Sequence, residues 1–167
     1  MTQIRYKNTF ADILWFSAYT YTHSPVLLLL YSALAGLVCF SAYTSVPASA
    51  SFAARICTML FMFAFIFSLV LGATALLVVA SLISRANRTI LTQHTISIGE
   101  TGLTEETEFN RTEQKWTGIP RLVRTRRHIF AYVSQYAAHV IPRRACENTA
   151  AWDAFYFELQ SNVQRNV

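Results

Sequence analysis

Six arginines in the C-terminal part of the chain are the residues whose type and spacing most favour binding chemistry. A guanidinium group offers a planar set of donors that matches phosphate and carboxylate oxygens. Residues 85–167 hold eleven Lys and Arg against eight Asp and Glu, so the excess of positive charge is local. Such a cluster predicts docking on anionic lipid or on a protein, and the alternative is an inert solvated surface. The six residues are Arg121, Arg124, Arg126, Arg127, Arg143 and Arg144.

Acidic and histidine residues offer a second set of candidates for chemistry. Glu105, Glu106, Glu108 and Glu113 fall within one expected hairpin, where alternation along a strand makes a polar face. A pair of carboxylates for acid and base catalysis would need opposed environments in a cleft. The histidines, His23, His94, His128 and His139, have no metal-ligand spacing. His128 and His139 can face each other across adjacent strands, but a third ligand is missing, so we expect no metal.

The remaining reactive groups point away from catalysis. Cys39, Cys57 and Cys146 are widely spaced, which predicts small apolar core residues. The chain has no glycine-rich phosphate loop, no nucleophile elbow and no metalloprotease helix motif. Aromatic residues do not interleave with the arginines in the manner of a single-strand binder, so nucleic acid is not an expected partner. We therefore predict a protein that is not an enzyme and that carries no cofactor.

Two hydrophobic runs must position the arginine cluster. No charged residue occurs between Asp12 and Arg55, or between Arg55 and Arg85. The first span is predicted from Pro25 to Tyr43 and the second within Ile56 to Ser84. About 20 apolar residues in a helix cross the ~30 Å hydrocarbon core of a bilayer. Residues 25–84 are thus predicted to form a transmembrane helical hairpin.

The sidedness of this hairpin follows from the basic residues near its ends. Arg5 and Lys7 precede the first span and Arg85 and Arg88 follow the second, whereas the short connection holds only Arg55. Cytoplasmic loops carry the excess of Lys and Arg, so both termini are predicted to be cytoplasmic. Two glycosylation sequons, at Asn87 and Asn110, are chance matches on this topology.

Residues 1–24 form a separate N-terminal segment on the sequence alone. The stretch IRYKNTF predicts a short strand, and its composition permits it to join a sheet. The aromatic residues that follow favour a helix lying at the cytoplasmic membrane interface, where amphipathic rings prefer to sit. A helix packed on the soluble domain is the alternative, and the two are compatible. The expected interfacial anchors are Trp15, Phe16, Tyr19 and Tyr21.

Residues 85–167 have the composition of a small soluble domain. Short alternating segments predict antiparallel strands, with turns near Glu100–Gly102, Asn110–Arg111 and Ser134–Gln135. From Asn148, apolar residues recur at steps of three and four, which indicates an amphipathic helix. The predicted fold class is a membrane α-helical hairpin plus an α+β domain, in which a small antiparallel sheet is closed by a C-terminal helix.

The domain resembles the YcxB-like family of bacterial membrane proteins. The resemblance is carried by Gly102 after an acidic turn, by Trp116 with Ile119, by the aromatic strand His128–Tyr132, and by the run Ile141-Pro142-Arg143-Arg144-Ala145. The layout is similar too, with an N-terminal Asp, here Asp12, and two spans before the domain. Cys146 departs from the pattern, because a bulky aromatic residue is usual there. The resemblance implies a fold similar to pleckstrin-homology-like (PH-like) domains in a bacterial inner membrane protein, and it implies no established activity.

These features favour a membrane-anchored interaction module. The hairpin is expected to hold the domain at the cytoplasmic surface, where the arginines meet membrane lipids and an unidentified protein partner. The alternative is an immunity protein that neutralises a membrane-acting toxin through its hairpin. The hairpin lacks ionisable groups at depth, which argues against a transporter or channel made by this chain alone.

Overall fold

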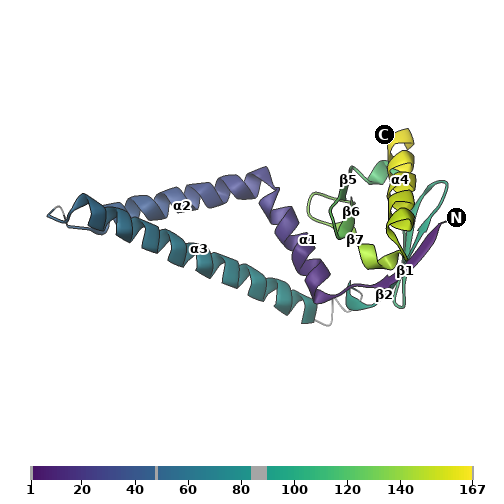
Figure 1. Ribbon diagram of the computed structural model, residues 1–167, viewed down its shortest axis with the longest axis horizontal. Helices are drawn as coiled ribbons and strands as arrows, with labels where there is room; N and C mark the ends of the chain where they lie inside the picture. The colour runs from purple at the N-terminus through teal and green to yellow at the C-terminus, as the bar shows by residue number, and fades with distance from the viewer. Residues whose placement is uncertain (1, 48, 84–89, 167) are drawn as a thin grey trace. The chain divides into compact units, whose positions relative to one another are not determined.

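The computed structural model describes residues 2–47, 49–83 and 90–166. They divide into two compact units, one formed by residues 17–80 and the other by residues 1–16 with residues 81–167. Figure 1 labels the four helices and most of the strands. The first strand of the second unit therefore precedes the helical hairpin in sequence, and the remainder of that unit follows the hairpin.

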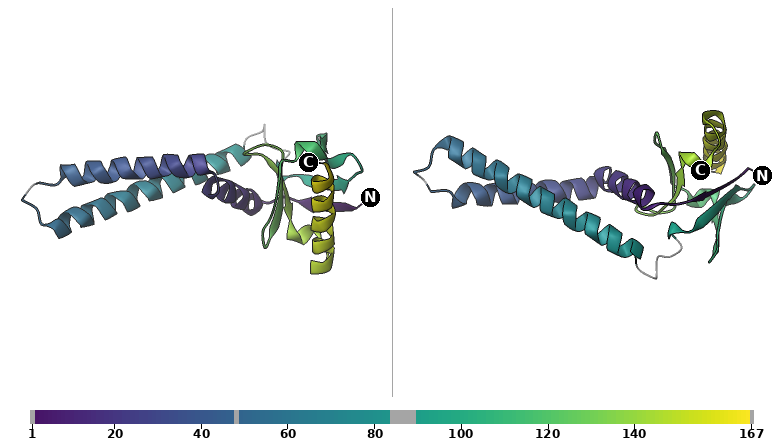
Figure 2. Two further views of the ribbon diagram at one scale, coloured as in Figure 1. Left: turned by 90° about the horizontal axis from the view of Figure 1, so that it is seen from above. Right: turned by 60° about the horizontal axis from the view of Figure 1, so that its bottom comes forward.

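The unit of residues 17–80 is a hairpin of two long apolar helices, which Figures 1 and 2 show as two arms joined by a short connection. Helix α2 spans Pro25–Ser45 and helix α3 spans Phe52–Ile83. Pro25 lies in the first turn of α2, as predicted, because a helix N-terminus leaves its first N–H groups unpaired anyway. Arg55, expected in the connection, instead lies in the first turn of α3, and its guanidinium donates to the carbonyl of Pro47 at 3.1 Å.

Among its described residues, the other unit contains seven strands, the first part of helix α1 (Phe10–Thr22) and the C-terminal helix α4. Strands β1 (Gln3–Lys7), β2 (Gln93–Ile98), β3 (Gly102–Thr107) and β4 (Arg111–Lys115) form an antiparallel sheet in the order β1-β2-β3-β4. Strands β5 (Arg121–Arg124), β6 (His128–Tyr132) and β7 (Ala138–Pro142) form a second antiparallel sheet. Short 3-10 turns, η2 (Trp116–Gly118) and η3 (Arg143–Ala145), follow β4 and β7, and helix α4 (Thr149–Asn166) ends the chain.

Strand β1 joins the four-stranded sheet. Gln3 pairs with Ser97 and Lys7 with Gln93, so β1 lies antiparallel to β2 at one edge of that sheet. The sequence permitted this pairing without deciding it. Residues up to Phe16 therefore fold with the C-terminal half of the chain.

One hydrophobic core unites the two sheets with α4. Its fully buried members come from both sheets, from η2 and from one face of α4, where Trp152, Phe155 and Leu159 recur at helical spacing. Strand β6 is buried along its whole length. Its odd-numbered residues, Ile129 and Ala131, face this core, and Phe130 packs against Phe16 of helix α1 (Phe10–Thr22). The three-stranded sheet is thus covered on both faces.

Candidate functional site

The six arginines separate into four with side-chain partners and two without. Arg121 stacks on the ring of Tyr132 at 3.8 Å from its centroid. Arg124 pairs with Asp153 of α4 and also lies 5.1 Å from the ring of Tyr156. These two arginines, on opposite ends of β5, are tied to the surface of their own domain, which lowers their capacity to bind a partner.

The other four arginines lie on two turns that a backbone hydrogen bond joins. Arg126 and Arg127 are exposed in the turn between β5 and β6, and within the described residues neither side chain has a hydrogen-bond or ion-pair partner. The amide of Arg143 donates to the carbonyl of Arg127 at 2.7 Å, which brings η3 beside this turn. Arg143 also donates to the hydroxyl of Thr149 at 2.6 Å. Half of the predicted docking set therefore gathers at one end of the three-stranded sheet, together with Arg144.

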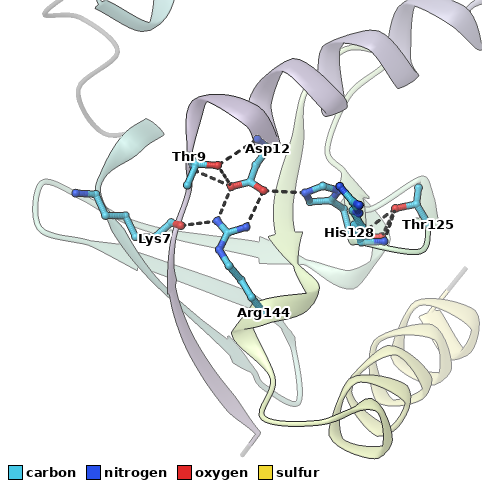
Figure 3. A network of polar contacts seen from close by, with 7 residues as sticks. Lys7, Thr9, Asp12, Thr125, His128 and Arg144 are labelled. Carbon is cyan, nitrogen blue, oxygen red and sulfur yellow. Dashed lines mark hydrogen bonds and ion pairs between the residues drawn. The ribbon is translucent and has the colours of Figure 1, made fainter.

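Arg144 is held by Asp12, 132 residues earlier in the chain, and Figure 3 shows the network. Its two terminal nitrogens donate to the two carboxylate oxygens of Asp12, at 2.8 and 2.5 Å, and one of them also donates to the carbonyl of Lys7 at 2.8 Å. His128 Nε2 lies 2.8 Å from Asp12 Oδ1. The Asp12 side chain is only 4% exposed, whereas that of Arg144 is 49% exposed.

The first turn of α1 explains why Asp12 occupies this position. Thr9 caps the helix, and the backbone amide and hydroxyl of Thr9 both donate to Asp12 Oδ2 at 2.7 Å. Burial by itself would raise the pKa of Asp12, but hydrogen bonds from Arg144, Thr9 and His128 outweigh it and hold the pKa well below its usual value. Asp12 is therefore an ionised, fully partnered group that ties α1 to the domain.

A groove borders this network. It runs beside β1 and the start of α1, and its rim carries three cations, Arg5, Lys7 and Arg144. Apolar walls come from Phe10 and Leu91, and the lining also includes Tyr6 and Asn8. The Tyr6 hydroxyl and Asn8 Oδ1 are buried without a partner among the described residues. An amphiphilic anion suits such a groove, because its charged and apolar parts would each meet a matching surface.

The predicted interfacial aromatic residues divide between two environments. Phe16 packs on Phe130 and Tyr132, with ring centroids 5.3 and 5.8 Å away, so its ring belongs to the domain. Trp15 is 58% exposed, and Tyr21 is partly exposed. The ring of Tyr19 stacks on His23 at 4.0 Å. Trp15 is thus the residue of this set most available to an interface, and Phe16 follows the alternative of a helix packed on the domain.

A second carboxylate, that of the partly buried Glu105, lies between two histidines. Oε1 of Glu105 is 2.9 Å from His94 Nδ1, and Oε2 is 2.9 Å from His139 Nδ1. Burial tends to raise the pKa of Glu105, but the hydrogen bonds of His139 and His94 lower it to about 2. Because Glu105 is on β3 and His139 on β7, this cluster connects the two sheets directly.

Two expectations for these residues were wrong. Glu105 was expected on a polar strand face with Glu106, but it shares the inward face of β3 with Leu103, whereas Glu106 is exposed. His128 and His139 do not face each other, because His128 pairs in register with Pro142 and His139 with Ala131. Their side chains thus lie on opposite faces of the three-stranded sheet, and His128 contacts Asp12 while His139 contacts Glu105.

Neither buried cluster has the geometry of a reaction centre. Each carboxylate oxygen of Asp12 and Glu105 contacts a nitrogen or hydroxyl of the protein, and among the described residues no serine or cysteine takes part in either network. Across residues 2–47, 49–83 and 90–166, no group of three His, Cys, Asp or Glu side chains could hold a metal ion. Both clusters fasten distant elements together: the Asp12 cluster holds Arg144 and His128, and the Glu105 cluster holds His94 and His139.

The motif residues noted in the sequence act at two corners of this domain. A Cβ atom on Gly102 would lie 2.3 Å from the carbonyl oxygen of Gln114, so only glycine fits there. Nearby, the indole N–H of Trp116 donates to the carbonyl of Glu100 at 3.1 Å, and Ile119 is fully buried. At the other corner, Ile141 enters the core and Arg144 holds Asp12.

The comparisons with known proteins agree with these motifs. No curated protein and no solved structure matches the chain. The model of the YcxB-like protein family does match, over the segment that includes β3 to β7, both motif corners and the first half of α4. The resemblance predicted from the sequence is therefore confirmed: residues 98–156 of this chain match the YcxB-like protein family.

Proposed function

We propose that this chain is a membrane-anchored, non-enzymatic interaction module of the bacterial inner membrane. Its PH-like domain docks on the anionic cytoplasmic surface through a basic end formed by Arg126, Arg127, Arg143 and Arg144 together with Arg5 and Lys7 at the groove. The observation that carries the proposal is that these cations gather at the end of the domain from which both connections to the apolar hairpin leave.

The apolar helices support the membrane anchor. The two candidate spans are 21 and 30 residues long, which is enough to cross the hydrocarbon core. Only 6% of the most apolar stretch of the first and 0% of that of the second is buried inside the chain. A core helix of a soluble protein would bury such residues, since exposed apolar area is unfavourable in water. Lipid is the solvent that suits these surfaces.

Strand pairing supports a topology in which both termini share one side. Lys7 lies before the hairpin and Gln93 after it, and they are partners in the β1–β2 ladder. If α2 and α3 each cross the membrane once, the two flanking segments return to the same side and can pair. Together with the excess of basic residues flanking the spans, this favours a cytoplasmic domain.

The strand arrangement supports the PH-like assignment. A PH-like fold combines a four-stranded and a three-stranded antiparallel sheet with a C-terminal helix that closes the core. This chain has that element order, with the hairpin inserted between its first two strands. The assignment goes beyond the family match, which gives the family and not the fold.

Charge and connectivity support the proposal that the basic end docks on lipid. Lys7 is the last residue of β1 and Gln93 the first of β2, so both connections to the hairpin start here. A basic side chain near an anionic membrane surface contributes about 1 kcal/mol. Arg126 and Arg127 are the cations of the β5–β6 turn that hold no other partner among the described residues, so they are free to meet phosphate oxygens.

The test uses the full chain in nanodiscs whose lipid headgroups carry a paramagnetic label. With phosphatidylglycerol present, we expect selective broadening of the backbone amide signals of Arg126 and Arg127. The double variant Arg126→Ala, Arg127→Ala should lose most of this broadening. Arg111→Ala, which removes an exposed cation from β4 at the far edge of the other sheet, is the matched control and should retain it. Equal broadening in discs of phosphatidylcholine alone would overturn lipid docking by charge.

A further inference from the structure

His94 occupies a position that only a doubly protonated imidazole can satisfy. Its Nδ1 lies 2.9 Å from a carboxylate oxygen of Glu105, and its Nε2 lies 3.1 Å from the carbonyl oxygen of Ile90. A carbonyl oxygen accepts hydrogen bonds and cannot donate them, and an ionised carboxylate is likewise only an acceptor. Both ring nitrogens must therefore donate, which requires the cationic form of the ring.

The surroundings of His94 keep this charge balanced. Tyr6 of β1 stacks on the ring at 5.6 Å, Glu105 of β3 supplies the negative charge, and His139 of β7 approaches from the far side of that carboxylate. Burial, followed by the charges of Glu105 and Asp12, raises the pKa of Tyr6 well above its usual value despite Arg144, so Tyr6 stays neutral. His139 makes one hydrogen bond, through Nδ1, and its Nε2 has no partner among the described residues.

Loss of one proton from His94 has unequal consequences for its two hydrogen bonds. Hydrogen bonds to a charged acceptor are about twice as strong as those between neutral groups. A neutral ring therefore keeps its proton on Nδ1 toward Glu105, and the lone pair of Nε2 then faces the lone pairs of the Ile90 carbonyl. That contact turns from attractive to repulsive, so the backbone at Ile90 is the part that separates.

We propose that His94 is a proton-controlled clamp that fastens the backbone of Ile90 to the four-stranded sheet. Ile90 precedes β2 and lies where the chain enters the domain after α3. The protonated ring holds this entry segment against β2, and the neutral ring releases it. Rising pH thus loosens the attachment between the domain and its connection to the hairpin. The pKa of His94 supports the same direction: burial lowers it, but Glu105 and the carbonyl of Ile90 raise it above its usual value.

Amide hydrogen exchange of the full chain in nanodiscs tests the clamp. After correction for the intrinsic effect of pH on exchange, we expect protection of residues 90–92 to fall at least tenfold between slightly acidic and clearly alkaline pH. His94→Gln has no titrating ring, so its protection should be low and independent of pH. His139→Gln leaves both hydrogen bonds of His94 in place and should retain the response. A wild-type chain whose protection does not change with pH would overturn the proposal.

A second measurement keeps the test valid if a variant fails to fold. In the wild-type chain with ¹⁵N-labelled histidine, both ring nitrogens of His94 should show protonated shifts at neutral pH. As the pH rises, Nε2 is expected to be the nitrogen that loses its proton. A neutral ring at neutral pH, or loss of the Nδ1 proton instead, would contradict the clamp. These readouts do not involve lipid headgroups, so they stand or fall separately from the docking proposal.

Discussion

The buried Asp12 and the partly buried Glu105 each fasten a distant part of the chain to the domain, but with different partners. Asp12 is held by a guanidinium, a capping threonine and a histidine, and Glu105 is held by two histidines. Each ties a distant part of the chain to a sheet. An arginine stays charged throughout the physiological range, whereas a histidine changes charge within it. The Asp12 cluster also contains His128, but it keeps its guanidinium and threonine donors at alkaline pH, whereas the positive charge of the Glu105 cluster comes from histidine alone.

The largest expected effect comes from removing the carboxylate of the Asp12 cluster. Asp12→Ala removes the carboxylate that Arg144, His128 and Thr9 share, and it also leaves α1 without half of its capping arrangement. Losing one partner of a buried ion pair costs about 3 to 5 kcal/mol, and we expect a loss at the lower end, about 3 kcal/mol, because the remaining Arg144 is half exposed to water. The free energy of unfolding, followed through the fluorescence of the buried Trp116 and Trp152, measures the loss. Asp12→Asn, which keeps the shape, should recover part of it. A loss below about 1 kcal/mol would contradict this role of Asp12.

The second largest effect is expected from removing the charge of Glu105, the carboxylate between the two histidines. Glu105→Gln removes the charge that balances His94 between the two sheets, and we expect about 2 kcal/mol of destabilisation. The same variant should lose the decline of stability at alkaline pH that we expect of the wild type from the raised pKa of His94. Glu106→Gln, on the exposed face of the same strand, is the matched control and should behave as the wild type. An unchanged alkaline decline in Glu105→Gln would assign that decline to another group.

The pH dependence of the wild type sharpens the comparison. Both carboxylates have lowered pKa values, so their stabilisation is present above the unfolded pKa and is lost as pH falls, for Glu105 through about 2. The pKa of His94 is raised, so its contribution is present below the unfolded value and is lost as pH rises through the folded value. Acid should thus weaken both clusters, and alkali the Glu105 cluster more than the Asp12 cluster. Unfolding curves across the pH range check this, with His94→Gln expected to lack the alkaline limb.

The smallest effect is expected from replacing the guanidinium of Arg144 with the ammonium group of lysine. Arg144→Lys keeps the charge but replaces a two-pronged contact with a single donor group, and it loses the bond to the carbonyl of Lys7. Because Arg144 is half exposed, we expect about 1 kcal/mol of destabilisation. The alkaline decline should be the same as in the wild type, since the Glu105 cluster is untouched. A variant as unstable as Asp12→Ala would show that lysine cannot replace arginine here at all.

Much of the fold could be predicted from sequence patterns. The absence of charge over two long runs predicted α2 and α3. Pro25 predicted the first residue of α2, because proline is favoured in the first turn of a helix. Alternation and turn residues located the strands after the hairpin, and the spacing of apolar residues from Asn148 located α4, whose first turn Asn148 caps. The reversal at Asn110–Arg111 is confirmed, because β4 begins at Arg111. These features depend on local chemistry, which a sequence records directly.

The polar clusters could not be predicted in the same way. Asp12 and Arg144 are far apart in the chain, and nothing in their local patterns records that they meet. The inward direction of Glu105 was accessible, because it lies two residues from the apolar Leu103 and so shares its strand face. Its partners His94 and His139 come from strands in two different sheets, and that meeting depends on how the sheets pack. Resemblance to a family supplied the motif residues but not these contacts.

The position of the hairpin between β1 and β2 governs the order of events during synthesis. Gln3 pairs with Ser97, which leaves the ribosome 94 residues later. At about 5 to 20 residues per second, the first strand waits roughly 5 to 20 s for its neighbour. During that interval α2 and α3 are made, while β1 still lacks its neighbouring strand β2. The β1–β2 ladder therefore closes only after both long apolar helices have been synthesised.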